Sequence, residues 1–178
     1  MIDPIDELKT RARLLHRRLA AGAADAVARL RMLPGFRKLG DAELAARAPE
    51  IRLHQCLSVI ARELGFAGWP AARAVLGGEW QAQDYGTLLC PTRCAAHFNH
   101  WFSDHGAAVA CQRERGGTIL VYRRHYVVVD RDYLATLGLD PDACEWQQLG
   151  SDWSRPRDIE ARTRLYGHLI AALPREAA

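Results

Sequence analysis

The residues best suited to binding chemistry form one short polar run, Tyr122-Arg123-Arg124-His125-Tyr126. Guanidinium groups match the geometry of phosphate and carboxylate, and aromatic rings among cations suit stacked bases. The run lies between two segments rich in β-formers, 118–122 (TILVY) and 126–129 (YVVV), which predict an antiparallel pair of strands. The basic side chains are then expected together at an exposed hairpin end, where they can hold an anion. The alternative is a charged turn that keeps the strand ends soluble, with its arginines paired to Asp130 and Asp132.

A second candidate chemistry uses Cys90 as a nucleophile. This cysteine follows a strand expected at Tyr85–Leu89 and precedes a helix expected from Pro91 to about Ser103. A helix N-terminus lowers the pKa of a thiol and favours the reactive thiolate. A free cysteine is more often a buried core residue, and no spacing selects its base among four candidates, which are His97, His100, His105 and His125.

The same region contains a possible metal site, Cys90-x3-Cys94-x2-His97-x2-His100. Cysteine and histidine are the ligands that zinc prefers. On the expected helix, however, Cys94 and His100 are about 9 Å apart along the axis, at about 1.5 Å per residue. Ligands of one zinc lie within about 4 Å of each other, so at most two of the helical residues can share the ion. We therefore expect a protein without zinc. No P-loop, GxGxxG or GxSxG motif is present, and we expect no cofactor.

The composition is that of an ordinary globular protein. The 178 residues are 49% hydrophobic and 25% charged, which is enough to bury a core. The first residues lack the pattern of a signal peptide, and no run approaches the roughly 20 apolar residues of a membrane span. Five cysteines without a regular framework indicate free thiols. We expect a soluble, cytoplasmic protein that does not enter a membrane.

The net charge of +3 is distributed unevenly along the chain. Residues 1–78 contain 13 Lys and Arg against 8 Asp and Glu, whereas residues 79–178 contain 11 against 13. A basic half can contact phosphate or acidic partners, which gives a second alternative function, nucleic-acid binding. A solvated, arginine-rich surface explains the same charge more simply, because clustering on one face does not follow from the sequence.

The first 78 residues predict a helical module. Asp3 and Pro4 begin a helix whose apolar positions repeat at spacings of three and four up to Leu19. Shorter helices are expected at 23–32 and 41–47, and again at Leu53–Leu64 and Pro70–Leu76. Gly65 is expected to end the fourth of these five helices in a left-handed conformation, with Leu53, Cys56, Leu57, Ile60, Leu64 and Trp69 buried.

After a linker at Glu79–Asp84, residues 85–178 predict a small α+β module. The expected order is β-α-α-β-β-α followed by a last helix. The α elements include Ala107–Arg115, a brief helix at Arg131–Leu137 that is capped by Asp130 and stopped by Gly138, and Ile159–Leu173. The fold class is therefore α+β, with a helical N-terminal module.

One segment carries a family resemblance. The run ARELGFAGWPAARAVL, residues 61–76, resembles a helical segment of many uncharacterised bacterial proteins, often placed ahead of ankyrin-repeat or glyoxalase-like domains. The C-terminal half is similar to small bacterial proteins of unknown function. Glyoxalase-like enzymes hold a metal through strand-borne glutamate and histidine, which the expected strands lack, so no catalytic residue follows from this resemblance.

These observations favour a non-catalytic binding or interaction protein of bacterial origin. Its ligand is expected to be an anionic small molecule or a protein partner at the Tyr122–Tyr126 hairpin. The alternatives are a small enzyme that uses Cys90 or a Cys/His metal site around His97, and nucleic-acid binding by the basic half.

Overall fold

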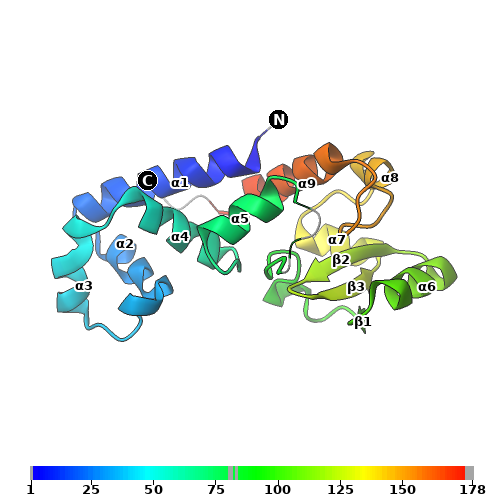
Figure 1. The fold of residues 1–178 in the computed structure, drawn as a ribbon, viewed down its shortest axis with the longest axis horizontal. Coiled ribbons are helices and arrows are strands. Elements are labelled where there is room, and N and C mark those ends of the chain that lie inside the picture. The colour runs from blue at the N-terminus through cyan, green and yellow to red at the C-terminus, as the bar shows by residue number, and fades with distance from the viewer. Residues whose placement is uncertain (1, 80–81, 83, 175–178) are drawn as a thin grey trace.

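The structure is a computed structural model that describes residues 2–79, 82 and 84–174. Within these ranges the fold is α+β, as the sequence predicts. One end of an elongated molecule consists of helices, and the other end contains a small antiparallel sheet with further helices around it (Figure 1). Part of the expected linker, residues 80, 81 and 83, lies outside the described residues.

The helical end begins with α1, whose start follows the predicted capping pattern. The backbone N–H of Asp6 donates to Asp3 Oδ1 at 2.9 Å, and Pro4 occupies the first turn. Residues 30–32, 34–36 and 48–50 form short 3₁₀ turns between the later helices. The helices of this end are α1 (Pro4–Ala20), α2 (Ala24–Arg29), α3 (Asp41–Arg47), α4 (Leu53–Glu63) and α5 (Trp69–Leu76).

The end of α4 has the left-handed glycine that the sequence predicts. Gly65 has φ 85°, and the N–H of Phe66 donates to the carbonyl of Ala61 at 3.0 Å, as in a Schellman motif. The predicted buried stripe is only partly correct. Leu53 is 40% exposed. Three other residues that were expected to be buried are only half-buried, namely Leu57, Leu64 and Trp69. The buried face of α4 is centred instead on Cys56, Val59, Ile60 and Ala61, because α1 and α5 both pack against that side.

The sheet has three strands in the order β1-β3-β2. The predicted hairpin is confirmed as β2 (Thr118–Tyr122) and β3 (His125–Val129), while β1 (His100–Phe102) pairs with the other edge of β3. One face packs on α6 (His105–Arg115) through Ala108, Ile119 and Val128, and the opposite face joins the main core. Residues 151–153 run beside β2. The N–H of Ile119 donates to the carbonyl of Ser151, and the N–H of Trp153 donates to the carbonyl of Ile119, both at 2.9 Å.

Two predicted elements before the hairpin are wrong. Tyr85–Leu89 is not a strand. Its first two residues are hydrogen bonded to the hairpin turn, but the N–H of Thr87 donates to the carbonyl of Gly65 at 3.2 Å, so no regular pairing with the hairpin continues. Pro91–Ser103 is not a helix: a 3₁₀ turn at Thr92–Cys94 precedes an irregular segment and then β1. Residues 97–100 (HFNH) are weak helix formers, so pairing with β3 outweighs their helical tendency.

The chain after the hairpin consists of helices. Asp130 caps α7 (Arg131–Leu137), which Gly138 ends at φ 91°, as predicted. A short helix that the sequence analysis missed, α8 (Glu145–Leu149), precedes α9 (Ile159–Ala172). The observed order from β1 onward is therefore β1-α6-β2-β3-α7-α8-α9, which corrects the expected β-α-α-β-β-α arrangement.

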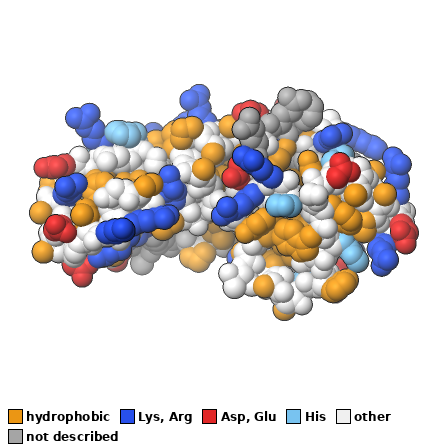
Figure 2. Space-filling model, turned by 60° about the horizontal axis from the view of Figure 1, so that its bottom comes forward, with side chains coloured by type: hydrophobic (Ala, Val, Ile, Leu, Met, Phe, Trp, Pro, Cys, Tyr) orange, Lys and Arg blue, Asp and Glu red, His pale blue; other side chains and the backbone are white. Residues whose placement is uncertain are grey.

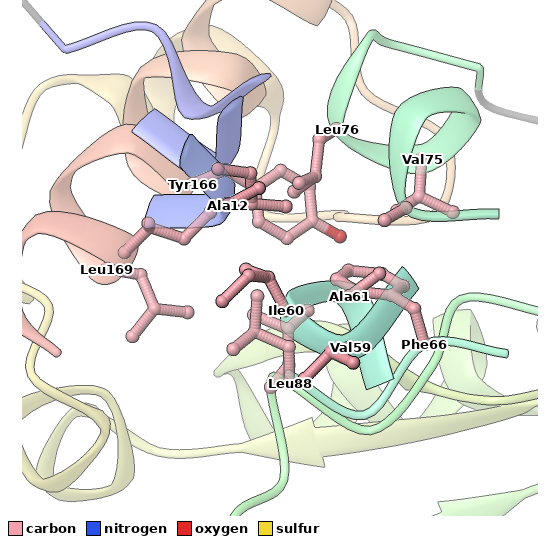
Figure 3. Packing of buried hydrophobic residues seen from close by; sticks show 14 of the residues in the cluster. Ala12, Val59, Ile60, Ala61, Phe66, Val75, Leu76, Leu88, Tyr166 and Leu169 are labelled. Atoms are coloured by element: carbon pink, nitrogen blue, oxygen red, sulfur yellow. The ribbon is translucent and has the colours of Figure 1, made fainter. Parts of the chain in front are cut away.

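The last helix packs back on the first. Figure 3 shows Tyr166 and Leu169 of α9 in one buried cluster with Ala12 of α1 and Ile60 of α4. Gly167 permits this approach, since a Cβ there would lie 2.3 Å from the carbonyl oxygen of Ile2. One continuous core therefore includes residues from both the 1–78 and the 85–178 ranges.

Candidate functional site

The basic hairpin end has a two-residue turn. Tyr122 and His125 are opposite each other in the β2–β3 register, so Arg123 and Arg124 alone form the connection. His125, expected in the turn, is instead the first residue of β3. Arg123 has φ 53°, the left-handed conformation that tight hairpin turns use. The side chains of residues 123–125 are all exposed.

The segment before the sheet is fastened to this turn. The N–H of Tyr85 donates to the carbonyl of Arg123 at 3.0 Å, and the N–H of Arg123 donates to the carbonyl of Gly86 at 2.7 Å. Asp84 Oδ1 accepts a further bond from the N–H of Gly86 at 2.8 Å, which closes a local turn. The aromatic ring of Tyr85 is thereby held close to the hairpin end.

A pocket of about 340 Å³ opens on this side of the hairpin. It is lined by Tyr85, Arg124, His125 and Tyr126, together with Ala82. No carboxylate is among these lining residues, and Arg124 makes no ion pair within the described part of the chain. A guanidinium, an imidazole and two phenols offer hydrogen-bond donors, so the hairpin pocket suits a small anion such as phosphate or a carboxylate.

A buried arginine lies within electrostatic reach of the pocket residue Tyr85. Arg162 of α9 is completely buried, and its Nη1 donates to the carbonyl of Trp153 at 3.2 Å. Its Nε and Nη2 have no hydrogen-bond partner among the described residues. Burial raises the pKa of Tyr85, and the charges of Arg162 and Arg155 oppose that shift, which places both cations within electrostatic reach of the tyrosine. Arg162 and Arg155 therefore contribute positive charge in the neighbourhood of Tyr85.

One carboxylate in this neighbourhood is already engaged. Asp152 also acts on the pKa of Tyr85, in the raising direction. Its Oδ2 lies 2.7 Å from His105 Nε2, and its Oδ1 accepts bonds from the backbone N–H and the hydroxyl of Ser154. The imidazole of His105 packs edge-on against Tyr126, with the ring centres 5.3 Å apart. Both carboxylate oxygens of Asp152 are thus already hydrogen bonded to His105 and Ser154.

The sequence analysis did not identify Arg162 or Asp152. A signal existed for Arg162, because it falls at helical spacing with Leu165, Tyr166 and Leu169, an apolar stripe where a charge is unexpected. No comparable signal marked Asp152. Its position depends on the pairing of residues 151–153 with β2, which local sequence does not reveal.

The two turn arginines serve different pockets. Arg123 lines a larger pocket of about 540 Å³ with Cys90, Arg93, Tyr122 and, among others, Glu63. The Arg123 guanidinium lies 6.0 Å from the centre of the Tyr122 ring. Arg123 and Arg124 therefore do not converge on one ligand site. Neither arginine forms an ion pair with Asp130 or Asp132 in the described structure. The expected alternative, a turn whose arginines are paired with these two carboxylates, is therefore not observed.

Cys90 lacks the features of an activated nucleophile. The helix expected after it is absent, so no helix dipole stabilises a thiolate. Burial instead raises the pKa of Cys90 to about 11. Within the described residues, none of the candidate histidines is hydrogen bonded to this thiol. The thiol is therefore protonated at neutral pH.

The Cys/His run does not assemble as a metal site. Cys94 is buried, whereas His97 Nε2 lies 2.9 Å from Thr136 Oγ1 and His100 packs against the ring of Phe98. Across residues 2–79, 82 and 84–174, no group of three or more His, Cys, Asp or Glu is arranged to hold a metal ion. The irregular path of residues 95–99 separates side chains that an unbroken helix would have brought to one face.

Part of the positive charge of the helical end is paired with neighbouring carboxylates. The side chains of Arg11, Arg29 and Arg31 pair with Glu7, Glu63 and Asp41, and Arg18 pairs with Asp25. Figure 2 shows Lys and Arg side chains in separate groups, interrupted by acidic and hydrophobic ones. On the face drawn in Figure 2, the described Lys and Arg side chains do not form one continuous basic track of the kind on which nucleic-acid binding usually depends.

Comparisons of the chain with protein-family models, with curated proteins and with solved structures found no match. The resemblances described for residues 61–76 and for the C-terminal half therefore stay predictions. Among the described helices, none has the length and apolar character to cross a membrane.

Proposed function

We propose that this chain is a non-catalytic binding protein whose ligand is a small anion held in the hairpin pocket. The observation that carries the proposal is the lining of that pocket. Arg124, His125 and two tyrosines face one cavity to which no described carboxylate contributes. Ligand oxygens in such a cavity meet the guanidinium of Arg124, which forms no ion pair among the described residues, beside an imidazole and two phenols.

The buried guanidinium of Arg162 supports the same proposal. A fully buried cation with two unsatisfied donor atoms is unfavourable unless an opposite charge lies close by. Asp152 is a described carboxylate close enough to Tyr85 to raise the pKa of that tyrosine. Its oxygens, however, are already hydrogen bonded to His105 and Ser154. An anion in the hairpin pocket would partly compensate this buried charge.

The pocket volume limits the ligand. A cavity of about 340 Å³ lies at the small end of the range for ligand pockets, about 300–1,000 Å³. Inorganic phosphate, a phosphorylated small metabolite or a short carboxylic acid is of suitable size. A catalytic role receives less support, because the Cys90 thiol is protonated and has no neighbouring histidine base among the described residues.

Isothermal titration calorimetry with inorganic phosphate, citrate and succinate tests the proposal. At least one of these anions should bind saturably to the wild-type protein. Arg124→Ala should weaken that binding about tenfold or more, because a hydrogen bond to a charged group contributes about 1.5–3 kcal/mol. Arg113→Ala is the matched control, since Arg113 is exposed on α6 and should leave the affinity unchanged. Equal affinity in both variants, or no binding of any of the three anions, would reject the hairpin pocket.

A further inference from the structure

A second surface, independent of the hairpin, lies on the helical end where α1, α4 and α5 contact one another. Each helix contributes side chains at a spacing of four residues. They are Ile5, Lys9 and Arg13 from α1, Leu53 and Leu57 from α4, and Trp69 and Arg73 from α5. Residues four apart lie on the same side of a helix, so three short stripes meet and enclose a groove of about 410 Å³.

The middle of this α1–α4–α5 groove is apolar and incompletely covered. Leu53 is 40% exposed, and Ile5, Leu57 and Trp69 are half-buried. Leu53, Leu57 and Trp69 were expected in the core, but Leu57 and Trp69 only border it, and the buried residues of α4 are Cys56, Val59, Ile60 and Ala61. The groove therefore offers aliphatic and aromatic surface that the described part of this chain leaves accessible.

The rim of the groove is basic. Arg13 and Arg73 are exposed, and neither forms an ion pair with any described residue. Lys9 pairs with Asp6 at 2.9 Å, so its charge is partly compensated. No carboxylate is among the lining residues. An occupant that matches this surface has an apolar side for the floor and negative charges for the two arginines.

We propose that the α1–α4–α5 groove docks an acidic, amphipathic segment of a partner protein. One or two apolar side chains of that segment pack on Leu53, Leu57 and Trp69, and its carboxylates pair with Arg13 and Arg73. Peptide is favoured over nucleic acid because the floor is mainly aliphatic, with one half-buried ring, whereas single strands bind on rows of aromatic rings along a basic track. Two separated arginines also match two carboxylates better than a continuous phosphate backbone.

Fluorescence anisotropy with three labelled helical peptides tests this docking site. The first peptide has leucine at two positions four residues apart among glutamates and alanines. The second replaces both leucines by serine, and the third replaces every glutamate by lysine. The wild-type protein should bind the first peptide saturably and should bind the other two at least tenfold more weakly.

Charge reversal then locates the binding. The double variant Arg13→Glu, Arg73→Glu should lose at least tenfold in affinity for the glutamate peptide and gain affinity for the lysine peptide. Arg37→Glu, an exposed arginine outside the groove, is the control and should bind as the wild type does. Arg124→Ala should also leave peptide binding unchanged, which separates this site from the hairpin pocket. Circular dichroism confirms that each variant is folded.

Several results would overturn the proposal. They are no saturable binding of the glutamate–leucine peptide, equal binding of the serine peptide, or an unchanged affinity in the double variant. Tighter binding of a single-stranded DNA oligonucleotide, lost in the same double variant, would assign the groove to nucleic acid instead. A concentration-dependent dimer that the double variant abolishes would assign it to a second copy of this chain.

Discussion

The backbones of Tyr85 and Arg123 are hydrogen bonded, with the Tyr85 N–H donating to the Arg123 carbonyl at 3.0 Å. The reciprocal bond from the Arg123 N–H goes one residue further, to Gly86. This pair of bonds holds the chain that enters the sheet region against the turn of the hairpin. The ring of Tyr85 and the side chain of Arg124 consequently line one pocket, although 38 residues lie between them in the sequence.

Gly65 should tolerate no side chain. Its φ is 85°, and a Cβ there would lie 1.9 Å from Thr87 Oγ1 and 3.1 Å from the Thr87 backbone nitrogen. Gly65→Ala should therefore lower the free energy of unfolding by more than about 1 kcal/mol through backbone strain and crowding. Gly35→Ala is the control, because no atom lies within 4 Å of its Cβ position. Urea denaturation measures both variants, and equal midpoints for the two would show that the strain argument is wrong.

The stability of the protein should fall at alkaline pH. Burial raises the pKa of the Cys56 and Cys90 thiols from 9.0 to about 11. The unfolded chain loses these protons near pH 9 while the folded chain retains them, so the stabilisation is complete below pH 9 and disappears as the pH rises through 11. Urea midpoints at pH 8 and pH 10.5 measure the loss.

Two cysteine variants test whether the buried thiols cause the loss of stability at alkaline pH. The double variant Cys56→Ala, Cys90→Ala should have a smaller difference between the two midpoints than the wild type. Cys144→Ala is the control and should keep the wild-type difference, because Cys144 is exposed. A wild-type midpoint that is the same at pH 8 and pH 10.5 would contradict the burial of these thiols.

Replacing Arg162 should cost unusually little for a completely buried residue. Arg162→Met keeps the apolar stem and removes a buried charge with two unsatisfied donors, and it gives up one bond to the carbonyl of Trp153. In phosphate-free buffer we expect a change within about 1 kcal/mol. Leu165→Ala, on the same helix face, should cost about 2–5 kcal/mol. A comparable loss in Arg162→Met would mean that the guanidinium is fully satisfied in the folded protein.

Local signals in the sequence predicted the capped and glycine-terminated helices and the central hairpin. Asp3, Gly65, Asp130 and Gly138 each act within a few residues of their own position, so their effects can be read from short segments. The TILVY and YVVV runs are close enough in sequence to pair without other help. The same locality placed Arg123 and Arg124 at the exposed turn.

Long-range pairing explains the errors. Whether Tyr85–Leu89 becomes a strand depends on how far it stays beside the hairpin, and it departs after two residues. The fate of His100–Phe102 depends on the free edge of β3. The pocket combines Tyr85 with Arg124, and the buried Arg162 acts electrostatically on Tyr85; these residues come together only through the tertiary fold. No local pattern contained that relationship.

A titration of ¹⁵N-labelled protein with inorganic phosphate, followed by two-dimensional NMR, tests the central claim most directly. The account predicts saturable shifts of the backbone amide signals of Tyr85, Arg124, His125 and Tyr126, with smaller changes around Arg162. Signals from Lys9, Arg13 and Arg73, in the separate α1–α4–α5 groove, should stay in place. Shifts confined to that groove, or no saturable shift at the hairpin at tens of millimolar phosphate, would contradict the assignment of an anion site to the hairpin pocket.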